Sequence, residues 1–231
     1  MFRVRLFVAT PVRGTFQQFV PSGSRYSAAS SRFNTAAMST ISDAITKDHR
    51  ELEQYYNEVT SSSDYDHQQR FGNQFTWELA RHSIAEELIV YPAFEQHMGQ
   101  KGHEMAEDDR KQHHRVKELL KEFQNMPAES ADYVPKLKEL WTVLSEHIKE
   151  EEEHDLPALE SALKSIQGES ENMAKKFGLT KAFVPSRSHP SAGENPYFES
   201  AMGMLAAPID HIADLFRKFP GKPTSPNPST K

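Results

Sequence analysis

The stretch His82-Ser-Ile-Ala-Glu86-Glu87-Leu-Ile-Val-Tyr-Pro92 returns 65 residues later as His147-Ile-Lys-Glu-Glu151-Glu152-Glu-His-Asp-Leu-Pro157. Both copies read His-x-x-x-Glu-Glu, and both place a proline ten residues after the histidine. The repeat extends upstream, where His49 and His113 follow each other at an offset of 64 residues. An internal repeat places paired residues at related positions in a fold. The repeated residues are therefore candidates for one shared site.

The repeated residue types point to a metal. Residues four apart on a helix share one face, about 5–6 Å apart, so each copy presents an imidazole and a carboxylate together. Imidazole and carboxylate groups are common ligands of transition metals. Burying such groups without a cation costs roughly several kcal/mol each. We expect a site for two metal ions, with room for a small ligand, built from six side chains: His49, His82, Glu86, His113, His147 and Glu151.

The apolar spacing around these residues predicts four helices. We expect them at 42–60, 66–97, 103–125 and 133–165, with Ser42 as the N-cap of the first. Pro92 should kink the second helix or end it early, and a break should follow at Gly99–Gly102. Helices of this length with short connections predict an all-α, up-down-up-down four-helix bundle with an internal two-fold repeat over residues 41–167.

A C-terminal extension of different character follows. Residues 183–196 are rich in Pro, Ser and Gly, which indicates a loop. We then expect short amphipathic helices over 198–219, divided at Pro208, and a disordered Pro-rich tail. The organisation predicted for 168–231 is thus a loop, short helices and a tail. The segment 198–219 could dock on a partner or cover one face of the bundle.

Composition excludes several classes of function. The chain has no cysteine, so disulfides, thiolate metal sites and cysteine nucleophiles are absent. No apolar run reaches the ~18 residues that a membrane-spanning helix needs. All 33 acidic residues follow residue 42, and an acidic body does not suit nucleic acid as a partner.

The first 40 residues carry five arginines and no acid, interleaved with Phe, Leu, Ser and Ala. This composition is typical of a mitochondrial transit peptide, with a disordered tail as the alternative. Met38 lies directly before the folded region. A start at Met38 would give a second, cytoplasmic form without the targeting segment.

Taken together, these motifs resemble the hemerythrin-like family, specifically its HHE cation-binding branch. The resemblance covers about residues 42–165 and rests on Asp48-His49-x-x-Leu52, His82-x-x-x-Glu86-Glu, His113-x-x-Val and His147-x-x-x-Glu151-Glu, in that order. It implies a non-haem centre of two iron ions per chain, joined by an oxo or hydroxo bridge. The four histidines would be terminal ligands, and Glu86 and Glu151 would be bridging carboxylates.

Two departures separate this chain from the oxygen-carrying members. Those members have a second histidine four residues after the first on the third helix, where this chain has Lys117. They also use an aspartate five residues after the last histidine, whereas here Glu151 at the fourth position matches better, with Glu152 at the fifth. Both departures argue against simple reversible oxygen storage.

Some assignments stay open at this stage. His114 could replace His113, and Glu53 or His154 could add a ligand. Glu87 and Glu152 lie about 100° from the ligand face of their helices, so we expect them at the surface or behind the ligands.

The balance of ligands favours binding over catalysis. Four imidazoles and two carboxylates leave a reduced iron pair with net positive charge, which suits a small anion or diatomic ligand such as oxygen, peroxide or nitric oxide. Our first hypothesis is a protein that binds or senses iron, oxygen or a related small ligand. The second is a di-iron oxidoreductase or peroxidase acting on peroxide or nitric oxide, and the third is an interaction module stabilised by its metal.

Overall fold

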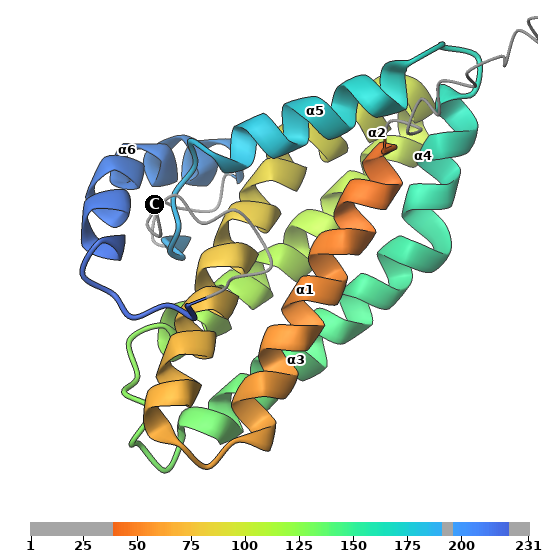
Figure 1. The fold of residues 1–231 in the computed structure, drawn as a ribbon. Helices are drawn as coiled ribbons and strands as arrows, with labels where there is room; N and C mark the ends of the chain where they lie inside the picture. The colour runs from red at the N-terminus through yellow and green to blue at the C-terminus, as the bar shows by residue number, and fades with distance from the viewer. Residues whose placement is uncertain (1–38, 191–195, 222–231) are drawn as a thin grey trace, which may run out of the picture. The chain divides into compact units, whose positions relative to one another are not determined.

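The computed structural model describes residues 39–190 and 196–221, without the side chains of 196–204. The described chain is helical and contains no strand (Figure 1). Its elements are α1 (Ile41–Ser61), α2 (Tyr65–Phe123), α3 (Tyr133–Glu150), the π-helix η1 (Glu151–Asp155), α4 (Leu156–Leu163), α5 (Glu169–Lys181) and α6 (Pro196–Asp214). No described helix is both long enough and apolar enough to cross a membrane. The expected targeting segment and the tail from residue 222 lie outside the described residues.

The N-cap of helix α1 lies two residues before the expected one. Thr40 caps it, because its hydroxyl accepts a hydrogen bond from the N–H of Asp43 and the Asp43 carboxylate accepts one from the N–H of Thr40. This reciprocal pair satisfies two N–H groups that no helical carbonyl can reach. The prediction of Ser42 as the cap was wrong. The Ser42 hydroxyl instead donates to Glu160 of α4, at 2.9 Å.

Helix α2 contains two arms of the bundle, and Gly99 separates them. Gly99 has φ 62° and ψ −135°, a conformation that glycine adopts without strain. The helix continues through Pro92 up to this residue, so the expected early end at Pro92 is not observed. At Gly102 a Cβ atom would lie 1.9 Å from the carbonyl oxygen of Phe94, so only glycine fits where the second arm leaves the turn.

The fourth arm of the bundle consists of α3, η1 and α4 in direct succession. The π-helix ends just before Pro157, which has no N–H to donate to the carbonyl of Glu153. A π-turn adds one residue to a helix and is frequent at functional sites. Here it begins at Glu151, one of the candidate ligands.

The apolar core consists of two clusters along the bundle. One cluster includes Leu52, Leu79, Val116 and Leu144, and the other includes Ile45, Ala85, Ala106 and Leu156. On every arm, the candidate ligands fall in the sequence between a residue of one cluster and a residue of the other. The polar layer therefore lies where the two apolar clusters meet, in the middle of the bundle.

The C-terminal extension begins with a helix that the sequence pattern did not predict. Helix α5 packs against α1 and α2 (Figure 1), with Met173 and Phe177 buried in the second apolar cluster. Helix α6 is a single element that passes through Pro208, so the predicted division at that residue is not observed. Its described part exposes an apolar row of Leu205, Ile209 and Ile212, and Phe216 is exposed just beyond its end.

Candidate metal centre

The structure brings the six predicted side chains together inside the bundle. None of them exposes more than 1% of its surface. His49 comes from α1, His82 and Glu86 from the first arm of α2, His113 from its second arm, His147 from α3, and Glu151 from the start of η1. His114 is exposed and pairs with Glu118, so it does not take part.

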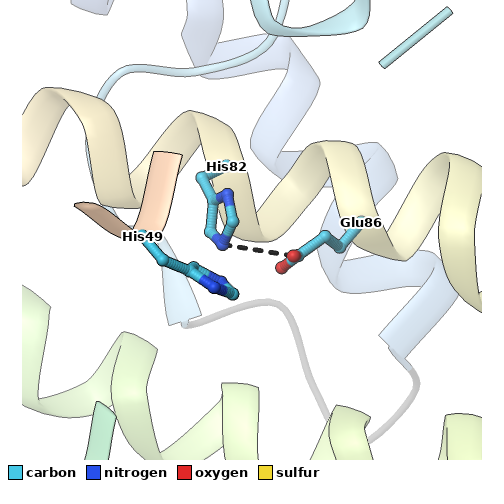
Figure 2. Close-up of side chains that lie close together, drawn as sticks. All are labelled: His49, His82 and Glu86. Atoms are coloured by element: carbon cyan, nitrogen blue, oxygen red, sulfur yellow. Dashed lines mark ion pairs between the residues drawn. The ribbon is translucent and has the colours of Figure 1, made fainter. Parts of the chain in front are cut away.

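Five of the six side chains form two donor sets that share one carboxylate. His49, His82 and Glu86 make one set, and Glu86, His113 and His147 make the other. Within each set the donor atoms lie within 4.8 Å of one another. Figure 2 shows the first set, with His82 and Glu86 side by side on one helix face and His49 reaching toward them from α1. This arrangement can hold two cations with Glu86 between them.

Each repeated carboxylate reaches across to the other half of the repeat. Glu86 places Oε1 3.1 Å from Nε2 of His82 and Oε2 3.3 Å from Nε2 of His113. Glu151 places Oε2 3.3 Å from Nε2 of His49. A carboxylate that faces imidazoles from both halves has the position that a bridging ligand requires.

All four imidazoles are oriented in the same sense. Nδ1 of His49 faces Glu152 at 2.8 Å and Nδ1 of His82 faces Asp48 at 3.3 Å. The other two pairs are His147 with Gln112, at 3.1 Å, and His113 with Glu87, at 3.5 Å. An acceptor at Nδ1 fixes the tautomer in which Nε2 carries the free lone pair. Each ring therefore directs its metal-binding nitrogen toward the shared carboxylates.

Unsatisfied polar atoms gather at this place. Nε2 of His49, Nε2 of His82 and both carboxylate oxygens of Glu86 and of Glu151 are buried without a hydrogen-bond partner. Each such atom costs about 1–3 kcal/mol if nothing binds it. Nε2 of His113 and Nε2 of His147 lie only 2.9 Å apart, so they compete for one proton or one cation. The residues present thus fit a metal pair, because cations would satisfy these atoms together.

The protonation states also depend on the buried carboxylates. Burial alone would lower the pKa of His49, but its contacts with the Glu151 and Glu152 carboxylates raise it to about 9. Burial lowers the pKa of His82, and burial together with the charge of His113 lowers that of His147 to about 3. Burial and the charge of Glu151 raise the pKa of Glu86 well above its usual value. In the metal-free protein, protons on His49 and Glu86 therefore offset part of the negative charge that metal cations would offset.

The π-turn explains why two consecutive glutamates contact the same histidine. In a regular helix Glu151 and Glu152 would point about 100° apart. Here Glu151 contacts Nε2 of His49 and Glu152 contacts its Nδ1. Glu152 in turn pairs with Arg50 at the surface. The expectation that Glu152 lies behind the ligands matches this geometry.

Lys117 occupies the place where oxygen carriers of the resembled family have a second histidine. Its side chain is buried and its Nζ lies 2.6 Å from Oε1 of Glu87. Glu87 also faces His113. Burial alone would raise the pKa of Glu87, but its contacts with His113 and Lys117 outweigh burial and lower this pKa to about 2. The lysine therefore pairs with Glu87, the carboxylate that faces Nδ1 of His113.

Sequence reasoning missed four residues near the centre: Asp48, Tyr91 and Asp109, which are buried, and Gln112, which is half-buried. Asp48 and Gln112 hold imidazoles, as described above. The Tyr91 hydroxyl lies 3.0 Å from both ring nitrogens of His113. Asp109 is buried 4.0 Å from Nδ1 of His147, and burial with the charge of Glu151 raises its pKa to about 9. Asp48 and Gln112 each precede a candidate histidine by one residue, which is the only signal that could have found them.

Two other candidates lie away from the centre. Glu53 is exposed and pairs with Arg50. His154 is exposed within η1.

An all-α bundle with a buried centre of histidines and glutamates defines a metal-binding protein of the four-helix class. The family model "Hemerythrin HHE cation binding domain" matches residues 40–159. An uncharacterized hemerythrin-like protein of Schizosaccharomyces pombe is 51% identical over 183 residues, which cover 79% of this chain and 89% of that protein. The chain therefore belongs to the hemerythrin HHE cation-binding family, as the sequence motifs indicated.

A more distant similarity is to a DNA nickase of Nostoc sp., which is 24% identical over 147 residues. That match covers 64% of this chain and 40% of the nickase. No solved structure matches the chain.

Proposed function

We propose that this chain is a non-haem di-iron protein that binds or senses oxygen or a related small ligand. The observation that carries the proposal is the pair of donor sets joined by Glu86. His49 and His82 would hold one ion, His113 and His147 the other, and Glu86 and Glu151 would lie between them. A bound iron pair would supply a Lewis-acidic, redox-active centre, and its net positive charge would favour a diatomic or small anionic ligand.

A cavity supports access for such a ligand. It has a volume of about 350 Å³ and lies between α1 and the α3–η1 arm. Its lining includes His49 and Glu152 on the side of the centre, and Arg50, Trp141 and Lys149 farther out. Of the six candidate ligands, His49 is the one that lines this cavity.

A second candidate function is that of an oxidoreductase acting on peroxide or nitric oxide. The Tyr91 hydroxyl favours it, because it places an O–H group 3.0 Å from His113, beside the second donor set. Such a group could donate a proton to a reacting oxygen atom at that place.

We also propose that residues 1–40 direct the chain to mitochondria and that a start at Met38 gives a cytoplasmic form. The arginine-rich, acid-free composition of this segment supports the proposal. Fluorescent fusions of residues 1–40 and of the chain starting at Met38 would test it. Import of the first fusion and a cytosolic signal from the second are expected, and a cytosolic signal from both would contradict it.

The experiment that tests the metal function is a metal analysis of the purified chain, combined with its visible spectrum before and after anaerobic reduction. We expect two irons per chain and a charge-transfer band that bleaches on reduction. A Glu86→Gln variant provides the control, since it lacks the shared carboxylate. Zinc alone, or no metal in a folded chain, would overturn the di-iron proposal.

The same sample separates the two functions. If the reduced protein takes up oxygen and releases it unchanged when the oxygen is removed, binding is supported. If the protein consumes added peroxide or nitric oxide through many turnovers, the oxidoreductase is supported. Replacing Tyr91 with Phe should then slow turnover while the metal content stays the same.

A further inference from the structure

A lysine from outside the family domain reaches the metal centre. Helix α5 begins at Glu169, ten residues beyond the matched range 40–159, and ends at Lys181. Lys181 is buried, and its Nζ contacts the carboxylates of Asp48 and Glu78. Asp48 faces Nδ1 of His82 at 3.3 Å. The structure therefore contains a continuous chain of contacts from α5 through Asp48 to a candidate ligand.

Helix α5 touches the same ligand a second time. The ring of Phe177 packs edge-on against the ring of His82, with centroids 6.0 Å apart and planes at 89°. Phe177 lies four residues before Lys181, so both side chains project from the same face of α5. The position of His82 thus depends on α5 in two ways. Lys181 contacts Asp48, the acceptor at Nδ1 of His82, and Phe177 packs against the ring.

Lys181 is itself held firmly in place. The guanidinium of Arg81 donates to the backbone carbonyl of Lys181 at 3.0 Å and to Glu78 at 2.9 Å, and it stacks over Trp77 at 3.1 Å from the ring centroid. Without the lysine, Asp48 and Glu78 would be buried carboxylates that lack this cation. Such groups rotate toward water or take up a proton. Either response would remove the charged acceptor from His82.

The second donor set has its own buried carboxylate and lysine. Behind His113 lies Glu87, and behind Glu87 lies Lys117, all within the second repeat and the first arm of α2. This lysine belongs to the bundle itself. Among the described residues, only the first donor set takes its buried cation from the C-terminal extension.

We propose that Lys181 is a positioning residue of the metal centre. By holding Asp48 against Nδ1 of His82, it sets the metal affinity of the His49–His82–Glu86 donor set while leaving the other set to Lys117. The inference rests on the proposed metal function. Removing a partner behind a metal-binding histidine typically weakens metal affinity 10- to 100-fold, so a loss of that size is expected at one position only.

The test is a stepwise Zn²⁺ titration of the full chain against a chromophoric chelator, with circular dichroism to confirm folding. Zn²⁺ avoids redox changes. Lys181→Met and Asp48→Asn should each keep one zinc position at wild-type affinity and weaken the other by ~10- to 100-fold. Lys181→Arg keeps the positive charge and should therefore retain most of the zinc affinity that Lys181→Met loses. Glu78→Gln is the matched control, because Glu78 contacts the same lysine but no candidate ligand.

The ¹⁵N signals of the imidazoles give a readout independent of affinity. In the wild type, His82 should be protonated at Nδ1, and Asp48→Asn should shift this signal while that of His113 stays in place. Two zinc ions bound to Lys181→Met and Asp48→Asn with wild-type affinity would overturn the inference. Equal weakening by Glu78→Gln would also overturn it. If the wild type itself binds no zinc, the proposed metal function fails first.

If Lys181→Met does not fold, Asp48→Asn and Lys181→Arg decide the matter. The amide of asparagine keeps the size of Asp48 and removes its charge, so this change tests the same contact with less effect on packing. Weakening by Asp48→Asn at one position supports the inference, and unchanged affinity in Asp48→Asn overturns it, while Lys181→Arg keeps the positive charge and should retain most of the wild-type affinity.

Discussion

Glu86 is the residue on which both donor sets depend. Its two oxygens face His82 and His113, which come from different halves of the repeat. We predict that Glu86→Gln lowers the affinity for both metal ions by at least about tenfold, because the neutral amide lacks the charge and the second oxygen of the carboxylate. Metal analysis after dialysis against a chelator would measure the loss.

The neighbouring residue provides the control for this change. Glu87→Gln removes the same charge one position along the helix, but Glu87 faces only His113. Glu87 also pairs with Lys117, but His113 is the one candidate ligand that it faces, so the change should weaken one metal position and spare the other. Equal retention of both ions by Glu86→Gln and the wild type would show that Glu86 does not bridge.

Metal binding should release protons. His49 has a pKa of about 9 in the metal-free protein and is therefore protonated at pH 7, whereas His82 and His147 have lowered pKa values and are neutral. A metal must displace the proton of His49, so zinc affinity should rise with pH and level off above about pH 9. Calorimetry in buffers of different ionisation enthalpy would count the protons. A binding heat that does not depend on the buffer would contradict this prediction.

At the residue scale, the sequence predicted the candidate metal ligands better than the side chains that hold those ligands in place. The six candidate ligands repeat at an offset of 64 or 65 residues, and the structure gathers them in one buried layer. Asp48 falls in the same register as Gln112, but Asp109 and Lys181 show no such repeat, because tertiary packing places them. Lys181 in particular has the composition signal of a surface cation, and only the fold of α5 reveals that it is buried.

At the scale of elements, the glycines test how the two arms of α2 meet. We predict that Gly102→Ala destabilises the protein by about 1–3 kcal/mol, because its Cβ would collide with the backbone of Phe94 at 1.9 Å. Gly178→Ala in α5 meets nothing within 4 Å and should stabilise by about 0.5–1 kcal/mol. Urea unfolding of both variants would measure the difference. Similar midpoints for the two would mean that the arms can separate at little cost.

The helix boundaries show which sequence signals were sufficient. Apolar spacing predicted the four arms of the bundle to within a few residues. The two repeated prolines did not predict where a helix ends. The helix passes through Pro92 unbroken, whereas a π-turn precedes Pro157. Helix α5 escaped prediction because its buried face is short and centred on Met173 and Phe177. Two apolar residues give too little periodicity to distinguish a helix from a linker.

At the scale of the whole molecule, metal should contribute to stability. The unsatisfied atoms of Glu86 and Glu151 lie between two apolar clusters, so a bound ion satisfies groups that the fold holds together. At a free metal concentration 100 times the Kd, one site adds about 2.7 kcal/mol. For a chain of this size we expect Tm to rise by about 5–10 °C. A calorimetric scan with zinc and with a chelator would show it, and coincident scans would contradict it.

The turn at Gly99 divides the bundle into two hairpins of like design, and each contributes two imidazoles and one carboxylate. The first donor set lies within the first hairpin, but the second takes Glu86 from that hairpin, and Glu151 of the second hairpin contacts His49 of the first. A chain cut at this exposed glycine should therefore reassemble from its two fragments more readily when metal is present. In evolutionary terms, the fold has the form of an ancestral homodimer of hairpins, joined into one chain through a single glycine.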